Sequence, residues 1–410
     1  MKIIELGGGG KKVMLAGGLI LFSSSYVVGD VLEMLMRDQG FWAFFLASLV
    51  FFIRFYKTYS YQDAFFWQVS AIIATLFRIE GITYLIALPL ILFFTHTQSF
   101  AISIRHFIKC NFINILSIII ILIAVFMLKV IPVDSLGRLN EVFTFNLYDE
   151  FTKKLFAKST IMGSDVLGGF LDEFAIQGIL LTFLLIIVVK TISATGLVNI
   201  GLAILSMRSK KSMLNNEVAY VLKVVAIIAV INMALIITKV FVLSGRYVIA
   251  LALILLIFAS FYLAEMFKYL TSPSKAEKKM KWLVIALIIF MSLGLVKNIL
   301  PKRDGYNYMQ DAVAWLKTNN ASNKPIFYDD PRVRYFADAP FIGTWGDSWI
   351  MVNNAIDSGA INQYEFLVIN HSYKHPEREK ILMGEIPQFF QIKRFSDAND
   401  RKSIVIYQRK

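Results

Sequence analysis

The sequence predicts a mainly α-helical, polytopic membrane protein that ends in a small α/β domain. Hydrophobic residues make up 57% of the 410 residues and charged residues only 17%, whereas soluble domains carry about 25% charged residues. The mean hydropathy is +0.61. Several apolar runs approach or exceed the roughly 20 residues that a helix needs to cross a bilayer. These runs stop at Pro301, where short β-rich segments begin.

The apolar runs predict about nine membrane spans, which together form a helical domain over residues 1–300. They cover residues 13–29, 40–56, 62–79, 81–97, 106–132, 176–206, 218–242, 246–267 and 280–298. The run 176–206 is long for a single helix. Lys190 and Gly196 could divide it, so one helix and two shorter pieces both stay open at this point.

The basic residues predict the orientation of these spans. The net charge is +13, and much of the excess lies in short loops between apolar runs, as at 208–211 and 275–281. Cytoplasmic loops carry such an excess, so we expect a cytoplasmic N-terminus and an extracytoplasmic C-terminal domain, in a bacterial inner (plasma) membrane. Membrane lipids are the expected surroundings. No nucleic-acid partner is expected, because such proteins cluster their basic residues on a soluble surface.

Residues 301–410 are predicted to form the extracytoplasmic α/β domain. The stretch "NYMQDAVAWLKTNN" has the apolar spacing of a helix. "PIFYDD", "EFLVIN" and "KSIVIYQR" are short β-rich runs that are bounded by turn-forming residues. Alternating helices and strands of this kind are typical of a small α/β layer structure.

Charged residues inside the apolar runs are the strongest functional signal. A charged side chain at the centre of a bilayer costs about 2.5–3.5 kcal/mol on insertion scales, yet "TLFRIEGITYLIALPL" contains Arg78 and Glu80. With the predicted topology, three turns bring polar residues to the outer end of the spans. These residues are Arg37, Asp38, Arg78, Glu80, Arg246 and Tyr247.

Two interpretations of these arginines stay open. Arginine remains protonated and offers several planar donors, so a cavity lined by arginines would suit a phosphate group. Alternatively, each arginine extends to lipid headgroups or pairs with a nearby carboxylate. The first interpretation predicts a lipid-phosphate site at the outer face.

The stretches "TLFRIEG", "RDQGFWAFFLASLVFFIRF" and "SGRYVIALALILL" resemble the membrane part of GT-C type glycosyltransferases. The closest likeness is to bacterial relatives of dolichyl-phosphate-mannose protein mannosyltransferases and of aminoarabinose transferases. The resemblance implies transfer of a sugar from a polyprenyl-phosphate donor to an extracytoplasmic acceptor. It also implies that Arg37, Arg78, Glu80, Arg246 and Tyr247 bind the substrate.

One part of the family pattern is missing. In the family, the catalytic acid usually lies in the first outer loop, and this sequence resembles the family only from about its third helix onward. Asp38 is the best-placed replacement as catalytic residue, with Asp30 and Glu33 as alternatives, because the reaction needs a base near the acceptor hydroxyl. A non-catalytic relative or partner subunit, and a lipid-linked sugar transporter, are the alternatives to an enzyme. The cofactor is unknown, and a divalent metal ion stays open.

Overall fold

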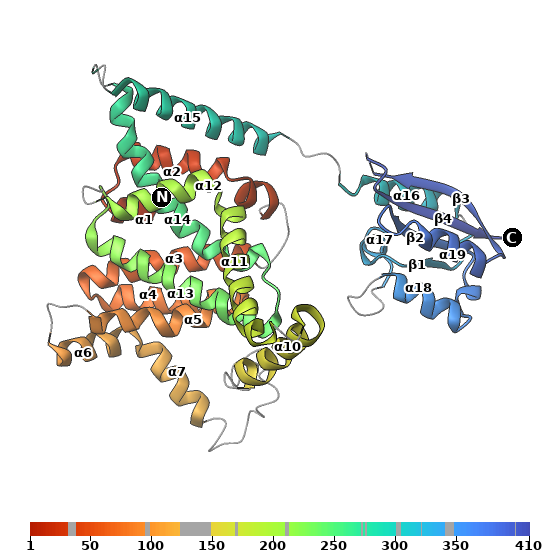
Figure 1. Ribbon diagram of the computed structural model, residues 1–410, viewed down its shortest axis with the longest axis horizontal. Coiled ribbons are helices and arrows are strands. Elements are labelled where there is room, and N and C mark those ends of the chain that lie inside the picture. The colour runs from red at the N-terminus through yellow and green to blue at the C-terminus, as the bar shows by residue number, and fades with distance from the viewer. Residues whose placement is uncertain are drawn as a thin grey trace. The chain divides into compact units, whose positions relative to one another are not determined.

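The structure is a computed structural model. It describes residues 1–31, 38–94, 99–123, 149–168, 171–209, 213–271, 274, 277–300, 305–320, 322–340, 348–397 and 399–410. The chain divides into two compact units, Met1–Leu300 and Pro301–Lys410 (Figure 1). The boundary falls where the composition of the sequence changes.

The first unit is built from helices. They are α1 (Lys2–Leu6), α2 (Lys11–Ser23), α3 (Asp38–Thr58), α4 (Tyr61–Phe77), α5 (Gly81–Ala87), α6 (Phe100–Cys110), α7 (Phe112–Leu122), α10 (Leu155–Ile161), α11 (Ala175–Thr195), α12 (Leu197–Arg208), α13 (Asn216–Val240), α14 (Ile249–Met266) and α15 (Lys278–Ile299). Short 3₁₀ or π segments join or extend them at Ser25–Val31, Leu88–Phe94, Glu150–Lys154, Met162–Leu167, Asp172–Phe174, Gly245–Tyr247 and Phe267–Leu270.

Five of these helical segments are long and apolar enough to cross a membrane, among the residues that the structure describes. They are Asp38–Thr58, Asp172–Thr195, Asn216–Val240, Ile249–Leu270 and Lys278–Ile299. Helices α2 and α4, which lie in two predicted spans, are shorter, with 13 and 17 residues. The predicted span 106–132 lies partly outside the described residues. The coarse prediction of a helical membrane-type fold is therefore confirmed, and the number nine stays a prediction.

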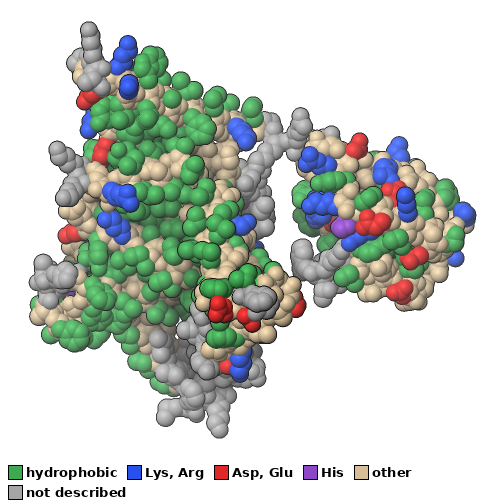
Figure 2. Space-filling model, viewed as in Figure 1, with side chains coloured by type: hydrophobic (Ala, Val, Ile, Leu, Met, Phe, Trp, Pro, Cys, Tyr) green, Lys and Arg blue, Asp and Glu red, His purple; other side chains and the backbone are tan. Residues whose placement is uncertain are grey.

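Helix α14 forms the centre of the first unit. It packs against α2, α11, α12 and α13, and almost every one of its residues is buried. Small residues such as Ala252, Ala259 and Ser260 let neighbouring backbones approach closely. A side chain on Gly17 of α2 would meet the hydroxyl of Ser260 at 3.3 Å. Hydrophobic side chains cover much of the visible face of this unit (Figure 2), as expected for a surface in contact with lipid.

The long apolar run 176–206 forms two helices. Helix α11 ends at Thr195 and α12 begins at Leu197, with Gly196 between them at φ +87°. This left-handed backbone favours glycine, since a Cβ would clash there. Lys190, the other residue considered as a break, lies inside α11.

The second unit is a four-stranded sheet with helices on both faces. The strands are β1 (Ile326–Tyr328), β2 (Phe366–Ser372), β3 (Phe389–Ser396) and β4 (Lys402–Arg409). The sheet order is β1-β2-β4-β3, with β1 and β2 parallel and the other pairs antiparallel. The helices are α16 (Asn307–Asn319), α17 (Pro331–Phe336), α18 (Ser348–Asp357) and α19 (Glu377–Glu385), and a 3₁₀ turn covers Ala360–Gln363.

Alternation along β4 explains the two layers of this unit. Ile404 and Ile406 pack with α16 and α17 residues in one core, whereas Val405 and Tyr407 pack with α18 and α19 residues in the other. Successive strand residues point to opposite faces of a sheet. This confirms the predicted small C-terminal sheet; its extracytoplasmic placement stays a prediction.

Candidate functional site

Arg78 is the centre of a buried polar cluster in the first unit. It directly follows α4, and Asp38 is the first residue of α3. Helices α3 and α4 form an antiparallel hairpin (Figure 1), so the beginning of α3 lies beside the end of α4. Glu80 lies in the turn that leads into α5. The fold therefore brings two carboxylates to Arg78: Asp38, which is 40 residues away in the sequence, and Glu80, which is two residues away.

Arg78 is bound to both carboxylates. Its Nε and Nη2 donate to the two carboxylate oxygens of Glu80 at 3.2 and 3.1 Å, a bidentate arrangement. Its Nη1 donates to Oδ1 of Asp38. Arg78 is 8% exposed and Asp38 2% exposed, whereas the side chain of Glu80 is 18% exposed. The three groups carry a formal charge of −1, so Arg78 brings no uncompensated positive charge.

Tyr247 joins this cluster to a second arginine. The guanidinium carbon of Arg78 lies 4.5 Å from the centre of the Tyr247 ring, and that of Arg246 lies 5.4 Å from it. Both distances are typical of cation–π contacts. Arg246 is exposed. It is therefore the cation of this cluster that a ligand can reach.

An apolar groove begins at the same cluster. It has a volume of about 340 Å³ and lies between the α5 region and α13. Its lining residues are Ile79, Glu80, Ile82, Thr83, Ile86, Ala87, Asn232, Leu235, Ile236 and Lys239. The Thr83 hydroxyl donates to Oδ1 of Asn232 at 3.2 Å, and Nδ2 of Asn232 lies 3.5 Å from the backbone oxygen of Glu80. These contacts fix α13 against the turn that carries Glu80.

The residues singled out in the sequence have the following positions. Asp38, Arg78, Glu80, Arg246 and Tyr247 lie in one cluster, drawn from three segments of the chain. Arg37 lies outside the described residues, as do Glu33 and the side chain of Asp30. The proximity is a structural fact, and the roles of these residues stay predictions.

Sequence reasoning missed Asn232 and the groove. The signal was present, since Asn232 is a polar residue inside the apolar run of α13, and polar residues inside membrane helices are commonly functional or paired. The groove itself depends on how α5 packs against α13, which no local pattern reveals.

Metal ligands were left open by the sequence. Within the described ranges of the chain, no three His, Cys, Asp or Glu residues lie close enough together to hold a metal ion. In the second unit, Nε2 of His371 lies 3.1 Å from the hydroxyl of Tyr407, and Nδ1 of His375 lies 3.1 Å from Glu377. These contacts give the two histidines partners other than a metal ion.

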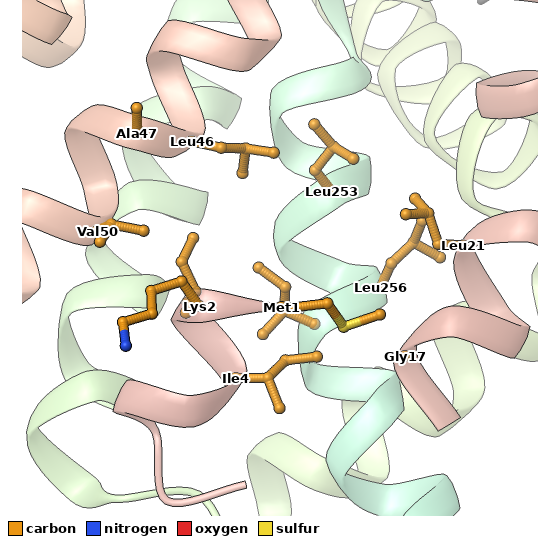
Figure 3. Close-up of a pocket in the computed structure, with 12 residues that line it drawn as sticks. Met1, Lys2, Ile4, Gly17, Leu21, Leu46, Ala47, Val50, Leu253 and Leu256 are labelled. Atoms are coloured by element: carbon orange, nitrogen blue, oxygen red, sulfur yellow. The ribbon is translucent and has the colours of Figure 1, made fainter. Parts of the chain in front are cut away.

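A further cavity lies between α1, α2, α3 and α14 (Figure 3). Its volume is about 280 Å³, and apolar side chains such as Leu46, Leu253 and Leu256 line it. Its charged side chain, Lys2, pairs with Glu5 at 2.9 Å. The side chains that line this cavity mostly offer hydrophobic contacts. The Arg78 cluster is therefore the better candidate site.

No model of a known protein family matches the chain, and no curated protein matches it. The sequence patterns and the geometry of the Arg78 cluster are therefore what indicate a function.

Proposed function

We propose that the first unit binds a polyprenyl-phosphate-linked sugar in the membrane, for transfer of the sugar to an extracytoplasmic acceptor. The phosphate would contact Arg246, and the isoprenoid chain would lie in the groove that begins at Glu80. The main supporting observation is that one buried cluster connects an exposed arginine to an apolar groove. A lipid phosphate needs both features at adjoining positions.

The two arginines have different roles in this proposal. Arg246 is exposed, and its guanidinium supplies donors that match phosphate oxygens. Arg78 is buried and bound to Asp38 and Glu80, so it holds Tyr247 and the two carboxylates in place. Its contribution to phosphate binding is then mainly indirect, through the position of Tyr247 under Arg246.

The groove suits a branched hydrocarbon chain. Most of its lining side chains are aliphatic, and each buried methylene group contributes about 0.8 kcal/mol to binding from water. Most of this gain is absent when the chain comes from lipid, since hydrocarbon is its solvent there too. The groove therefore contributes shape and position more than affinity.

Sugar transfer also requires a base. The acceptor oxygen forms a bond to C1 of the sugar, the bond from C1 to the phosphate oxygen breaks, and the acceptor proton passes to a carboxylate. Asp38 is the catalytic candidate from the sequence, but its carboxylate is buried and bound by Arg78. Glu80 is more exposed and lines the groove. The geometry thus favours Glu80 over Asp38 as the group that reaches an acceptor.

The same geometry favours a second candidate function, a non-catalytic subunit that binds the same lipid. Both carboxylates of the cluster are engaged by Arg78, so neither is a free base. Purified chain, reconstituted in lipid with polyprenyl-phosphate sugars and candidate acceptors, separates the two functions. Turnover that disappears in Glu80→Gln would indicate an enzyme, whereas donor binding without turnover would indicate a subunit.

The binding experiment uses undecaprenyl phosphate and the protein in lipid nanodiscs. Loss of one charged contact to phosphate costs about 1.5–3 kcal/mol, so Arg246→Ala should weaken binding by about 10-fold to 150-fold. Lys268→Ala is the matched control. Lys268 is also exposed, lies 4.9 Å from the centre of the Tyr269 ring, and follows the opposite end of α14. Equal binding by wild type and Arg246→Ala would refute the proposed phosphate site.

A further inference from the structure

A cavity lined by both polar and apolar residues lies where α11 ends and α12 begins. Its volume is about 520 Å³, within the roughly 300–1,000 Å³ of small-molecule sites. Half of the lining residues in the described part of the chain are polar, and none of these is acidic. The polar ones are Ser23, Ser24, Ser25, Tyr26, Ser193, Thr195, Asn199 and Lys297.

Two lining residues have unsatisfied hydrogen-bonding groups. Thr195 is 2% exposed and Asn199 is 8% exposed. Nδ2 of Asn199 donates to the backbone oxygen of Thr195 at 2.8 Å, which fixes the orientation of the amide. The Asn199 side-chain oxygen and the Thr195 hydroxyl have no hydrogen-bond partner among the protein groups that the structure describes. Each such buried group costs about 1–3 kcal/mol, a cost that a bound ligand removes.

The helix break adds further donors at the same place. The first backbone N–H groups of a helix have no partner within that helix, and the first residues of α12, Leu197 and Val198, line the cavity. Discontinuous membrane helices commonly place such ends at bound polar ligands. The cavity therefore offers backbone donors, hydroxyl groups and one amide oxygen.

The unpaired groups select the chemical class of the ligand. The Asn199 oxygen only accepts hydrogen bonds, so its partner must donate one. A phosphate diester only accepts and cannot do this. Among the lining residues that the structure describes, a cationic ligand would face Lys297 and no carboxylate. A sugar ring supplies hydroxyl groups that both donate and accept. We infer that this cavity binds a sugar.

The cavity adjoins the Arg246 region. Tyr26 lines the cavity, and a Cβ on Gly245 would lie 2.3 Å from the Tyr26 hydroxyl, so Tyr26 lies directly against the residue before Arg246. The sugar is then the glycosyl group of the lipid-phosphate donor. This assignment of its source rests on the proposed function, whereas binding of the sugar itself does not.

The test measures thermal unfolding of the protein in nanodiscs with free hexoses, hexosamines and pentoses, added singly at millimolar concentrations. At least one sugar should raise the Tm of the wild type. Thr195→Val and Asn199→Leu should abolish this shift. Without sugar, Thr195→Val should unfold at the same or a higher temperature than wild type, because an unpaired buried hydroxyl has been replaced by an apolar group. Asn199→Leu also loses the bond from Nδ2 to the Thr195 backbone oxygen, so its Tm without sugar should be lower than that of the wild type.

Ser206→Ala is the matched control. Ser206 is also buried on α12 with an unpaired hydroxyl, but it does not line the cavity, so this variant should keep the sugar-dependent shift. The inference is overturned if no sugar shifts the Tm, if the shift persists in Asn199→Leu, or if inorganic phosphate or ethanolamine shifts it instead. Arg246→Ala should keep the sugar-dependent Tm shift but should bind undecaprenyl phosphate more weakly. If the wild type shows the sugar-dependent shift but does not bind undecaprenyl phosphate, the proposed function is refuted and the sugar site is not.

Discussion

Removal of the Arg78 side chain tests whether the buried cluster is a tightly coupled ion-pair network. In Arg78→Ala, the Asp38 carboxylate loses the donor that now binds it, and Glu80 loses both of its bonds to Arg78. Asp38 is 2% exposed and cannot regain water. Glu80 is partly exposed and can be rehydrated in part.

The expected cost follows from these contacts. Three hydrogen bonds between charged groups, at about 1.5–3 kcal/mol each, would sum to roughly 5–9 kcal/mol. Bonds within one network are not additive, and Glu80 recovers some hydration. Loss of one partner of a buried ion pair typically costs about 3–5 kcal/mol. We therefore expect Arg78→Ala to lower the free energy of unfolding by about 3–5 kcal/mol.

An ion pair of the first unit that is exposed on both sides offers a matched control. Nζ of Lys2 lies 2.9 Å from Oε1 of Glu5, and both side chains are 53% exposed. Water can replace this lysine, so Lys2→Ala should cost about 1 kcal/mol or less. Both variants are unfolded by SDS titration in mixed micelles, with extrapolation of the free energy of unfolding to zero SDS. Equal costs for the two variants would refute the network at Arg78.

Three further predictions concern other parts of the chain. Burial raises the pKa of Asp329 from 3.8 to about 7. Between these pH values the folded state therefore binds more protons than the unfolded state. The stability of a 301–410 fragment should fall by up to roughly 4 kcal/mol as the pH rises from about 4 to 7. Asp329→Asn should flatten this urea-unfolding profile; an unchanged slope would assign it to another group. Gly196→Ala places a side chain at φ +87° and should cost about 1–2 kcal/mol in SDS unfolding, whereas no loss would show that the break is not strained for alanine. A reporter that is active only outside the cytoplasm, fused at Lys410, should be active, and a silent fusion would reverse the predicted orientation.

The broad fold was predictable because helices that cross a bilayer need long apolar runs with few charged residues. The helical first unit follows from apolar runs, and the second unit from alternating strands such as β4. Helix lengths were harder to predict, since α2 and α4 are shorter than their apolar runs. Hydropathy does not show where a helix ends inside a protein. The break at Gly196 was one of two options because glycine permits a left-handed backbone without requiring it.

The candidate site was predictable in composition but not in connectivity. Arg78 and Glu80 stand out because charge is costly in an apolar run. The predicted topology put Asp38 and Arg246 at the same, outer end of the predicted spans. The sequence could not show that Arg78 is bound to both carboxylates, since this depends on how α3 and α4 pack. Nor could it reveal the groove beside Asn232, which two distant helices form.

The proposed function requires that a polyprenyl phosphate binds with its phosphate at Arg246 and its chain in the groove next to the Arg78 cluster. The most direct measurement is photo-crosslinking of the protein in nanodiscs with a polyprenyl phosphate that carries a diazirine near its phosphate end, followed by peptide mass spectrometry. We predict crosslinks near Arg246 and to the groove-lining residues within 79–87 and 232–239, and competition by unlabelled undecaprenyl phosphate. Crosslinks that map only to the exposed residues of α15 would contradict the proposed function. So would crosslinks that are not reduced by unlabelled undecaprenyl phosphate.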